Sequence, residues 1–460
     1  MIQMSLAEIA SITAGSVHGD QTAVVTGPVV IDSRRAAPGG LFAALTGENA
    51  DGHDYAEDAV AAGVTAVLCS RPVGVQHVLV GDVTEALAAL SRFTARRLTG
   101  AGMTVVGITG SSGKTSTKDL TGALLERLGP TVAPEGSFNN ELGLPLTVLR
   151  ADESTRYLVL EMSARGAGHI AWLCDVAPPF IGAVLNVGHA HVGEFGSLEG
   201  VAKAKGELVE ALPADGVAIL NAGDPRVLAM ATRTAARVVT FGSDDAQIRA
   251  RDVSLDELAR PSFTLVAQDG TARVRMLLHG AHHVANALAA AAIAHELGMP
   301  VADIATGLSE TGARSKWRME LRRRADGVVV INDAYNANPD SVRAALDAVA
   351  HLAGGRGIAV LGYMAELGDE AEASHAEVGR LAALAGLARI IAVGEGTEAI
   401  VAGARSVAGW DGEAEWVASK PDAVGALQNR LRPSDVVLVK ASSVVALWEV
   451  ANALLEEVTR

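Results

Sequence analysis

A turn rich in glycine and serine follows an apolar segment shortly after residue 100 and constrains the fold more than any other feature. It reads Gly107-Ile-Thr-Gly110-Ser111-Ser112-Gly113-Lys114-Thr115. Glycines let backbone amides approach phosphate oxygens closely, and a helix that begins after such a turn adds positive potential. In loops of this kind the lysine bridges the outer phosphates of a nucleotide, and the threonine hydroxyl ligates Mg²⁺. The sequence therefore predicts a strand, a phosphate-binding loop and a helix.

The spacing of this loop differs from that of the common phosphate loop. Five residues, instead of four, separate Gly107 from Gly113. A glycine-rich turn without any ligand is the alternative, and the coincidence of strand, turn, Lys-Thr pair and helix disfavours it. The loop alone does not separate a ligase from a GTPase switch, a kinase or a motor.

Short β-rich segments alternate with helical patterns from Met103 onward, which predicts a parallel sheet covered on both faces. The expected strands are 103–109, 157–161, 180–186, 217–220 and 237–241, with helices such as 114–128 and 198–212.

The same pattern begins again in the last third of the chain, which predicts a second, Rossmann-like α/β layer. Its expected strands are 328–332, 358–361, 389–393 and 436–440, and its expected helices are 341–352, 371–385 and 422–431. A small α/β unit precedes the central one. The fold prediction is thus α/β with three domains, 1–83, 84–313 and 314–460.

Charge and cysteine content exclude several classes of protein. With 53 acidic against 38 basic residues, the net charge of −15 argues against a duplex nucleic-acid binder. Two cysteines are too few for a disulfide framework, which suggests a reducing cytoplasm. No export signal is recognisable, and the apolar run 284–294 is shorter than the roughly 20 residues that cross a bilayer. We expect a cytoplasmic protein without membrane insertion.

Several motifs together resemble those of the Mur ligase family, in the family's order and over nearly the whole chain. They are Asp32-Ser33-Arg34, Thr109-Gly110-Ser-Ser-Gly113-Lys114-Thr115, Ser137-Phe138-Asn139-Asn140, Ala202-Lys203-Ala204-Lys205 and Asn332-Asp333-Ala-Tyr335-Asn336. The resemblance implies an ATP-dependent ligase that joins a carboxylate to an amine through an acyl phosphate, in peptidoglycan precursor synthesis. The first motif belongs to a UDP-sugar domain that folylpolyglutamate synthases, a related family, lack. It implies that Ser33 and Arg34 contact a UDP-linked substrate.

The resemblance also assigns the residues that hold ATP. It implies that Gly110, Ser111, Ser112, Gly113, Lys114 and Thr115 cradle the phosphates and that Arg318 reaches the γ-phosphate. It further implies that Asn286 contacts adenine and that Asp333 binds the ribose hydroxyls. His283 stands where the family often has a second asparagine.

A group of metal ligands follows from the same resemblance. Thr115, Glu161, His191 and Lys205 would hold two Mg²⁺ ions, with Lys205 converted to a carbamate by CO₂. The implied catalytic set is Lys114, Glu161, His191, Lys205 and Arg318.

The implied substrates are UDP-N-acetylmuramoyl-tripeptide and D-alanyl-D-alanine, with a monomeric enzyme. Asn139, Asn140, Tyr335 and Asn336 would contact substrate. The segment Met364-Ala-Glu366-Leu367-Gly368, with His375, resembles the D-alanyl-D-alanine-adding members. Two positions depart from their pattern, Tyr363 in place of an acid and Ser443 in place of an arginine.

Three alternatives remain at this stage. The chain could add another amino acid to another UDP-peptide, or act as a folylpolyglutamate-like ligase, or serve as a non-catalytic phosphate-loop switch. The last alternative predicts no need for Glu161, His191 or Lys205. For a ligase whose ATP contacts divide between two domains, we expect hinge closure near residues 306–316.

Overall fold

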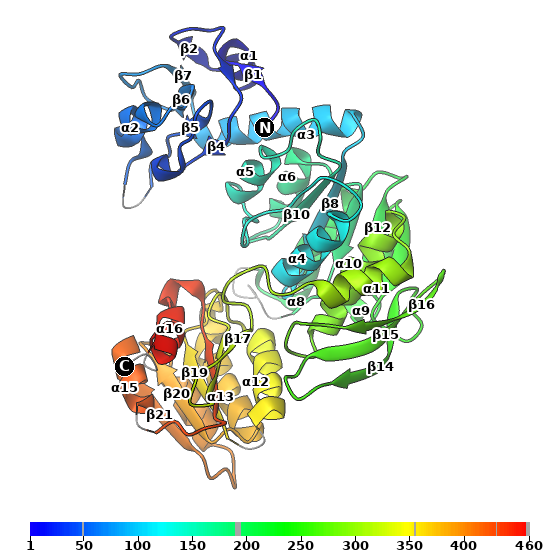
Figure 1. Ribbon diagram of the computed structural model, residues 1–460, viewed down its shortest axis with the longest axis vertical. Coiled ribbons are helices and arrows are strands. Elements are labelled where there is room, and N and C mark those ends of the chain that lie inside the picture. Colours follow the sequence, from blue (N-terminus) through cyan, green and yellow to red (C-terminus); the bar gives the residue numbers. More distant parts are fainter. Residues whose placement is uncertain (48–49, 189–194, 354–355, 429, 457–460) are drawn as a thin grey trace.

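The protein is described by a computed structural model that covers residues 1–460 except 48–49, 189–194, 354–355, 429 and 457–460. Figure 1 shows the chain as three α/β units along its long axis, with the N-terminal unit at one end and the C-terminal unit at the other. The α/β prediction is confirmed. None of the described helices is long and apolar enough to cross a membrane.

The N-terminal unit contains a small sheet in the order β2-β7-β6-β5-β4. Strands β4 to β7 pair in parallel, and β2 joins antiparallel to β7. The strands are β2 Ser16–His18, β4 Val29–Val30, β5 Leu41–Ala43, β6 Ala66–Cys69 and β7 His77–Leu79, with helices α1 Leu6–Ile12 and α2 Ala56–Ala61. A separate antiparallel pair joins β1 Met4–Ser5 to β3 Val24–Val25.

The long helix α3, Val83–Gly100, leads from this sheet to the central unit. Asp82 caps its start by accepting the Glu85 N–H at 2.9 Å. Capping of this kind satisfies one of the backbone donors that a helix start leaves unpaired. On the buried face of α3, Ser91 donates to the Pro145 carbonyl at 3.0 Å, which fixes the helix against α5, Gly143–Val148.

The central unit contains a fully parallel sheet in the order β13-β12-β11-β8-β10-β9. All five predicted strands are confirmed. They are β8 Thr104–Thr109, β10 Tyr157–Glu161, β11 Ile181–Val184, β12 Val217–Asn221 and β13 Arg237–Phe241, and the two-residue edge strand β9 Thr131–Val132 completes the sheet.

Side chains alternate between two cores on opposite faces of this sheet. Val105 and Leu158 lie in the core on one face, whereas Val106 and Val159 lie in the core on the other. This alternation is the two-residue period of a strand with both faces buried. The covering helices are α4 Lys114–Leu125, α6 His169–Val176, α8 Leu198–Glu210, α9 Pro225–Leu228, α10 His283–Glu296 and α11 Val301–Glu310.

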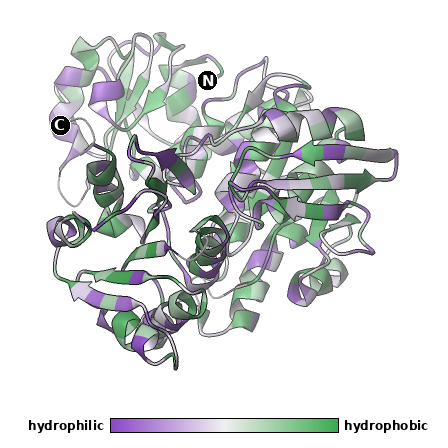
Figure 2. Ribbon diagram, turned by 60° about the horizontal axis from the view of Figure 1, so that its bottom comes forward, coloured by the Kyte–Doolittle hydropathy of each residue, from purple (hydrophilic) through white to green (hydrophobic). Residues whose placement is uncertain are grey.

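An antiparallel sheet that the sequence did not predict is attached to this unit. It consists of β14 Arg249–Leu255, β15 Pro261–Ala267 and β16 Gly270–Arg275. Strand β14 is mostly exposed and polar, so it lacks the apolar run that signals a buried strand. Figure 2 shows hydrophilic bands along these strands. Phe263 and Leu265 on β15 are buried in the core that contains the alanines of α10.

The C-terminal unit has a six-stranded sheet in the order β17-β18-β22-β19-β20-β21. All its pairs are parallel except the edge pair of β17 and β18, and the four predicted strands are confirmed. The strands are β17 Glu320–Arg323, β18 Val329–Asn332, β19 Gly357–Gly362, β20 Arg389–Val393, β21 Glu413–Val417 and β22 Val436–Lys440. The helices are α12 Pro339–Ala353, α13 Ala371–Leu384, α14 Glu398–Arg405, α15 Lys420–Leu427 and α16 Trp448–Glu456.

Candidate active site

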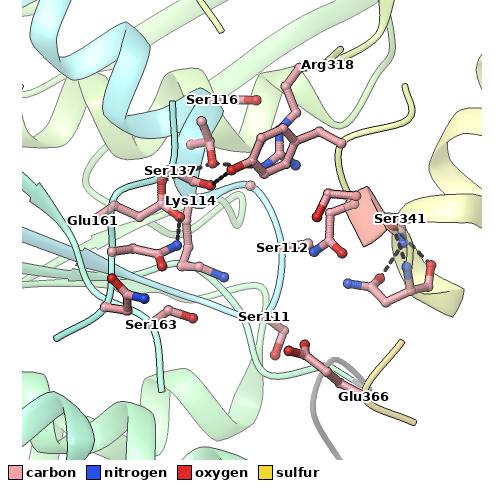
Figure 3. Close-up of a pocket in the computed structure, with 18 of the residues that line it drawn as sticks. Ser111, Ser112, Lys114, Ser116, Ser137, Glu161, Ser163, Arg318, Ser341 and Glu366 are labelled. Carbon is pink, nitrogen blue, oxygen red and sulfur yellow. Dashed lines mark hydrogen bonds between the residues drawn. The ribbon is translucent and has the colours of Figure 1, made fainter. Parts of the chain in front are cut away.

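A polar cavity of about 320 Å³ lies between the central and C-terminal units (Figure 3). Parallel sheets bind ligands beyond the carboxyl ends of their strands, and the ends of β8 and β10 open into this cavity. The lining residues are Ser111, Ser112, Gly113, Lys114, Thr115, Ser116, Ser137, Asn139, Asn140, Glu141, Glu161, Ser163, Arg165, His169, Arg318, Tyr335, Asn336, Asn338, Ser341, Glu366 and Ser443.

The glycine-rich turn forms a loop between β8 and α4, as predicted. Gly113 precedes α4 with φ +80°, a left-handed conformation that favours glycine. A Cβ at this position would lie 2.3 Å from Oδ1 of Asn286, so the site has no room for a side chain. Asn286 therefore lies directly beneath the loop, and its predicted contact with adenine stays a prediction.

Asn186, two residues after the neighbouring strand β11, holds the same loop. Its Oδ1 accepts the Ser112 N–H at 2.9 Å, and its Nδ2 donates to the Ser112 carbonyl at 3.1 Å. Sequence reasoning did not select Asn186 as a site residue. The available signal was its position, since it ends the predicted strand 180–186 at the ligand-binding edge of the sheet.

Lys114 begins α4 and folds back over the loop, where Nζ donates to the Gly110 carbonyl at 2.8 Å. Burial lowers the pKa of the Lys114 amine, and the negative charge of Glu161 partly opposes this shift. A lysine amine held above a ring of backbone amides is suited to binding an anion.

Three other predicted side chains converge around Glu161, which ends β10 and is buried. Its Oε2 accepts the Thr115 hydroxyl at 3.0 Å, and its Oε1 accepts Asn139 Nδ2 at 2.7 Å. Arg318 Nη2, from the C-terminal side, donates to the Thr115 oxygen at 3.1 Å. The structure thus brings Thr115, Asn139, Glu161 and Arg318 together, and Figure 3 shows Glu161 and Arg318 beside the same cavity.

The Arg318 guanidinium is held by an aromatic ring and keeps a spare donor. Its carbon lies 4.3 Å from the centre of the Tyr335 ring, and Tyr335 hydrogen-bonds Ser137 of the central unit. Arg318 Nε is buried and has no hydrogen-bond partner among the described protein atoms. A buried donor without a partner suggests a ligand, such as a phosphate oxygen.

Two predicted substrate residues also have local structural contacts. Asn140 Oδ1 accepts the Gly143 N–H at 2.8 Å at the start of α5. The Asn336 carbonyl accepts Lys440 Nζ at 2.8 Å. Both residues line the cavity, and their contacts with substrate stay predictions.

Lys205 lies on α8 with only 2% of the residue exposed. Burial lowers its pKa well below the ordinary value, and the positive charge of Lys114 lowers the pKa further. The neutral amine is the form that reacts with CO₂, and a lowered pKa favours that form, so the residue fits a carbamate. His191, the other predicted metal ligand, lies outside the described residues.

Asp333 is buried at the end of β18 and forms an ion pair with Lys440, Nζ to Oδ2 at 2.5 Å. Its other oxygen accepts the Met319 N–H at 3.0 Å. Desolvation lowers the pKa of Lys440, whereas Asp333 opposes that shift.

Ser33 and Arg34 do not line this cavity. They lie in a 3₁₀ turn, Ser33–Arg35, of the N-terminal unit, where the exposed Arg34 pairs with Asp32 at 2.8 Å. Asp32 and Arg35 instead line a smaller hollow of about 280 Å³ that also contains Phe138 and Arg150 of the central unit.

Sequence models of the Mur ligases match three consecutive parts of the chain. "Mur ligase family, catalytic domain" covers residues 28–99, "Mur ligase middle domain" covers 108–294, and "Mur ligase, glutamate ligase domain" covers 317–443. A UDP-N-acetylmuramoyl-tripeptide–D-alanyl-D-alanine ligase from Mycobacterium tuberculosis (strain ATCC 25618 / H37Rv) is 49% identical, covering 100% of this chain and 99% of that protein. The chain belongs to the Mur ligase family.

Further relatives of this Mur ligase agree along their whole length. The protein of the same name from Escherichia coli (strain K12) is 36% identical, and the match covers 100% of both chains. A crystal structure of MurF from Acinetobacter baumannii has a TM-score of 0.88 at 30% identity, over 99% of both chains. A structure of MurF ligase from Thermotoga maritima in complex with ADP has a TM-score of 0.80 at 28% identity, over 94% of this chain and 98% of that one.

Family membership decides between the broad alternatives. The chain is a Mur ligase with the three-domain α/β fold of that family, and it is an ATP-dependent ligase. The alternative of a non-catalytic phosphate-loop switch is wrong. A folylpolyglutamate synthase from Mycobacterium tuberculosis is similar at 18% identity and a TM-score of 0.62, which reflects the common fold alone.

Proposed function

We propose that this Mur ligase joins D-alanyl-D-alanine to UDP-N-acetylmuramoyl-tripeptide and converts ATP to ADP and phosphate, in the synthesis of peptidoglycan precursors. The observation that carries the chemistry is the contact of Arg318, from the C-terminal side, with the Thr115 hydroxyl of the phosphate loop. The names of the full-length relatives support this choice of substrates.

A carboxylate is a poor acyl donor, because oxide or hydroxide would have to leave. Its oxygen therefore attacks the γ-phosphate of ATP, the bond between the γ-phosphorus and the bridging oxygen breaks, and ADP leaves. The amine of D-alanyl-D-alanine then attacks the acyl carbon of the acyl phosphate. Phosphate leaves and a proton is released as the amide forms.

Charge on the transferred phosphoryl group is stabilised by the cations around the cavity. Lys114 and Arg318 approach it from opposite units, and the unpaired Arg318 Nε is available for a phosphate oxygen. The loop residues Gly110, Ser111, Ser112 and Gly113 would cradle the phosphates, for which the Ser112 N–H would exchange its bond to Asn186 Oδ1 for one to a phosphate oxygen. Asn286 and Asp333 would complete the nucleotide site at adenine and ribose.

The residues present fit Mg²⁺. Thr115 and Glu161 place two hard oxygens 3.0 Å apart, and burial lowers the pKa of the Lys205 amine, which favours the neutral form that a carbamate requires. Thr115, Glu161, His191 and carbamylated Lys205 would hold two ions. Bound Mg²⁺ would neutralise phosphate charge during the transfer.

The UDP-peptide would lie between the first two units. Ser33 and Arg34 would contact its UDP end, and Asn139, Asn140, Tyr335 and Asn336 would lie near its reacting end. The domain limits 1–83, 84–313 and 314–460 remain part of this proposal. The use of ATP and the two buried free thiols support a cytoplasmic enzyme, and we propose that it acts as a monomer.

The test is phosphate release across a panel of UDP-muramoyl peptides, each with and without D-alanyl-D-alanine. We expect release only when the tripeptide substrate and the dipeptide are both present. Rapid ATP turnover without either would contradict the proposal. Faster phosphate release with a single amino acid in place of the dipeptide would favour a different acceptor. Single amino acids belong in the panel because Tyr363 and Ser443 depart from the pattern of the D-alanyl-D-alanine-adding members.

A further inference from the structure

Arg318 lies between two residues with a rare backbone conformation. Trp317 has φ +59° and Met319 has φ +49°. Residues with a Cβ seldom adopt such angles, and the conformation persists only where the surroundings hold it. The segment 317–319 must therefore be held by its neighbours.

One contact holds the Met319 side of this segment. The Met319 N–H donates to Asp333 Oδ1 at 3.0 Å, and Lys440 Nζ donates to Asp333 Oδ2 at 2.5 Å. Lys440 also donates to the Asn336 carbonyl at 2.8 Å. Because Lys440 ends β22 and Asp333 follows β18, two adjacent strands of the C-terminal sheet hold the backbone beside Arg318.

A second contact holds the other side. The Trp317 indole stacks on Trp448, the first residue of α16, with ring centres 4.1 Å apart and an interplanar angle of 4°. The Trp317 carbonyl accepts the Tyr335 N–H at 3.3 Å. Offset aromatic stacking of this kind fixes the orientation of the ring and of the backbone that carries it.

We propose that Lys440 and Trp448 are positioning residues that hold the strained segment 317–319 and so keep the Arg318 guanidinium directed at the phosphate loop. Neither side chain is part of the described lining of the cavity. Trp448 reaches it through the segment that carries Arg318, whereas Lys440 reaches it through that segment and also through Asp333 and Asn336. The inference rests on the proposed function, in which Arg318 stabilises the transferred phosphoryl group.

If Lys440 and Trp448 had a purely structural role, their loss would have a different effect from the one that a positioning role predicts. If Lys440 only neutralises a buried carboxylate and Trp448 only fills the core, their loss loosens the C-terminal unit as a whole. If they position Arg318, their loss loosens segment 317–319 selectively, and the loss of Trp448 lowers turnover through that arginine.

Hydrogen exchange of the free protein tests the structural link and requires no turnover. In Lys440→Met and Trp448→Leu, we expect the Met319 amide to exchange at least about tenfold faster than in the unchanged protein, with the strands β19 and β20 unaltered. Trp448→Phe keeps a stacking ring and should restore most of the protection. Trp416→Leu removes a half-exposed tryptophan of the same unit and serves as the control. Unchanged exchange at Met319, or faster exchange throughout the unit, overturns the inference.

Turnover tests the catalytic link. Because a small displacement of a catalytic group can reduce rates by about 100-fold, Trp448→Leu should lower kcat by about 10- to 100-fold and change KM for ATP by less than about threefold. The double variant Arg318→Lys/Trp448→Leu should have the kcat of Arg318→Lys within about threefold, since both changes act on one group. If the loss of kcat in the double variant equals the product of the losses in the two single variants, the inference is overturned.

The two readouts separate the possible failures. If the unchanged protein releases no phosphate with the proposed substrates, the proposed function fails and hydrogen exchange alone decides the positioning role. If Lys440→Met does not fold, the Trp448→Leu and Trp448→Phe pair decides it, because Trp448 is only partly buried.

Discussion

The Thr115 hydroxyl is the point where the two halves of the cavity meet. It donates to Glu161 at the end of a central strand and accepts from Arg318 of the following unit. A single hydroxyl can do both, because it has one hydrogen and two lone pairs. Loss of this hydroxyl therefore disconnects the arginine from the loop as well as removing one oxygen from the proposed ion site.

Gly113→Ala tests the geometry of the loop. A side chain at φ +80° costs about 1–2 kcal/mol, and its Cβ also collides with the Asn286 amide oxygen. We expect lower thermal stability and loss of ADP binding in calorimetry. Gly425→Ala, in an open position on α15, is the control and should be neutral or slightly stabilising. Normal ADP affinity in Gly113→Ala would contradict this description of the loop.

Glu161→Gln tests the buried carboxylate. The change keeps the shape but removes the charge, so we expect phosphate release to fall by about 100-fold or more, with a higher Mg²⁺ requirement. Glu141→Gln, which alters a more exposed carboxylate of the same cavity, should have a much smaller effect. Steady-state kinetics over a Mg²⁺ series measures both, and equal losses would count against the special role of Glu161.

Individual site residues differ in how far the sequence could predict them. The motif around Lys114 was enough to predict the phosphate-binding loop, because the residues that form this loop are consecutive in the sequence. The contacts of Asn186 with Ser112 and of Trp448 with Trp317 join residues far apart in sequence, and no local pattern encodes such pairs. The positions of Ser33 and Arg34 away from the main cavity likewise follow from the placement of a whole unit.

At the scale of elements, His375 joins α13 to the loop after β19. Its Nδ1 donates to the Ala371 carbonyl at 2.7 Å, and its Nε2 accepts the Met364 N–H at 3.0 Å. The neutral ring alone can make both contacts, and burial lowers the pKa of His375 below its ordinary value.

This arrangement predicts a dependence of stability on pH. As pH falls through the ordinary histidine range, the unfolded chain binds a proton at His375 before the folded chain does, so the free energy of unfolding decreases. His375→Gln, which cannot take up a proton, should be less stable near neutral pH but show a weaker decrease between pH 7 and the lowered pKa. Urea unfolding at several pH values measures the difference, and parallel pH profiles for the two proteins would refute it.

The sequence predicted those strands that are buried on both faces. Strands β8, β10 and β12 read as continuous apolar runs because core lies on each side of them. Sheet β14–β16 has one exposed face and a polar first strand, so its sequence resembles that of a loop. The edge strand β9 is only two residues long and carries no periodic signal.

For the whole molecule, closure is the main expectation. Residues 306–310 are the last part of α11, and residues 311–316 connect that helix to the segment that carries Arg318. Arg314 in this connection forms a bidentate pair with Glu126 of the central unit at 2.7 and 2.8 Å. ATP contacts that divide between two units favour a hinge here.

Small-angle scattering with and without ligands tests this hinge. We expect a smaller radius of gyration with nucleotide and UDP-peptide than in the free enzyme, because both ligands contact more than one unit. Arg314→Ala should shift the free enzyme toward more extended forms without altering its fold. Identical scattering curves in all states would count against a hinge at 306–316.

The placement of Arg318 beyond the linker has a consequence for inhibition. A small molecule that separates Trp317 from Trp448 would withdraw the guanidinium from the loop while leaving the backbone of the loop in place. Because such a compound would itself occupy no nucleotide contact, we expect ATP to weaken its binding only through the contact of Arg318 with the phosphate.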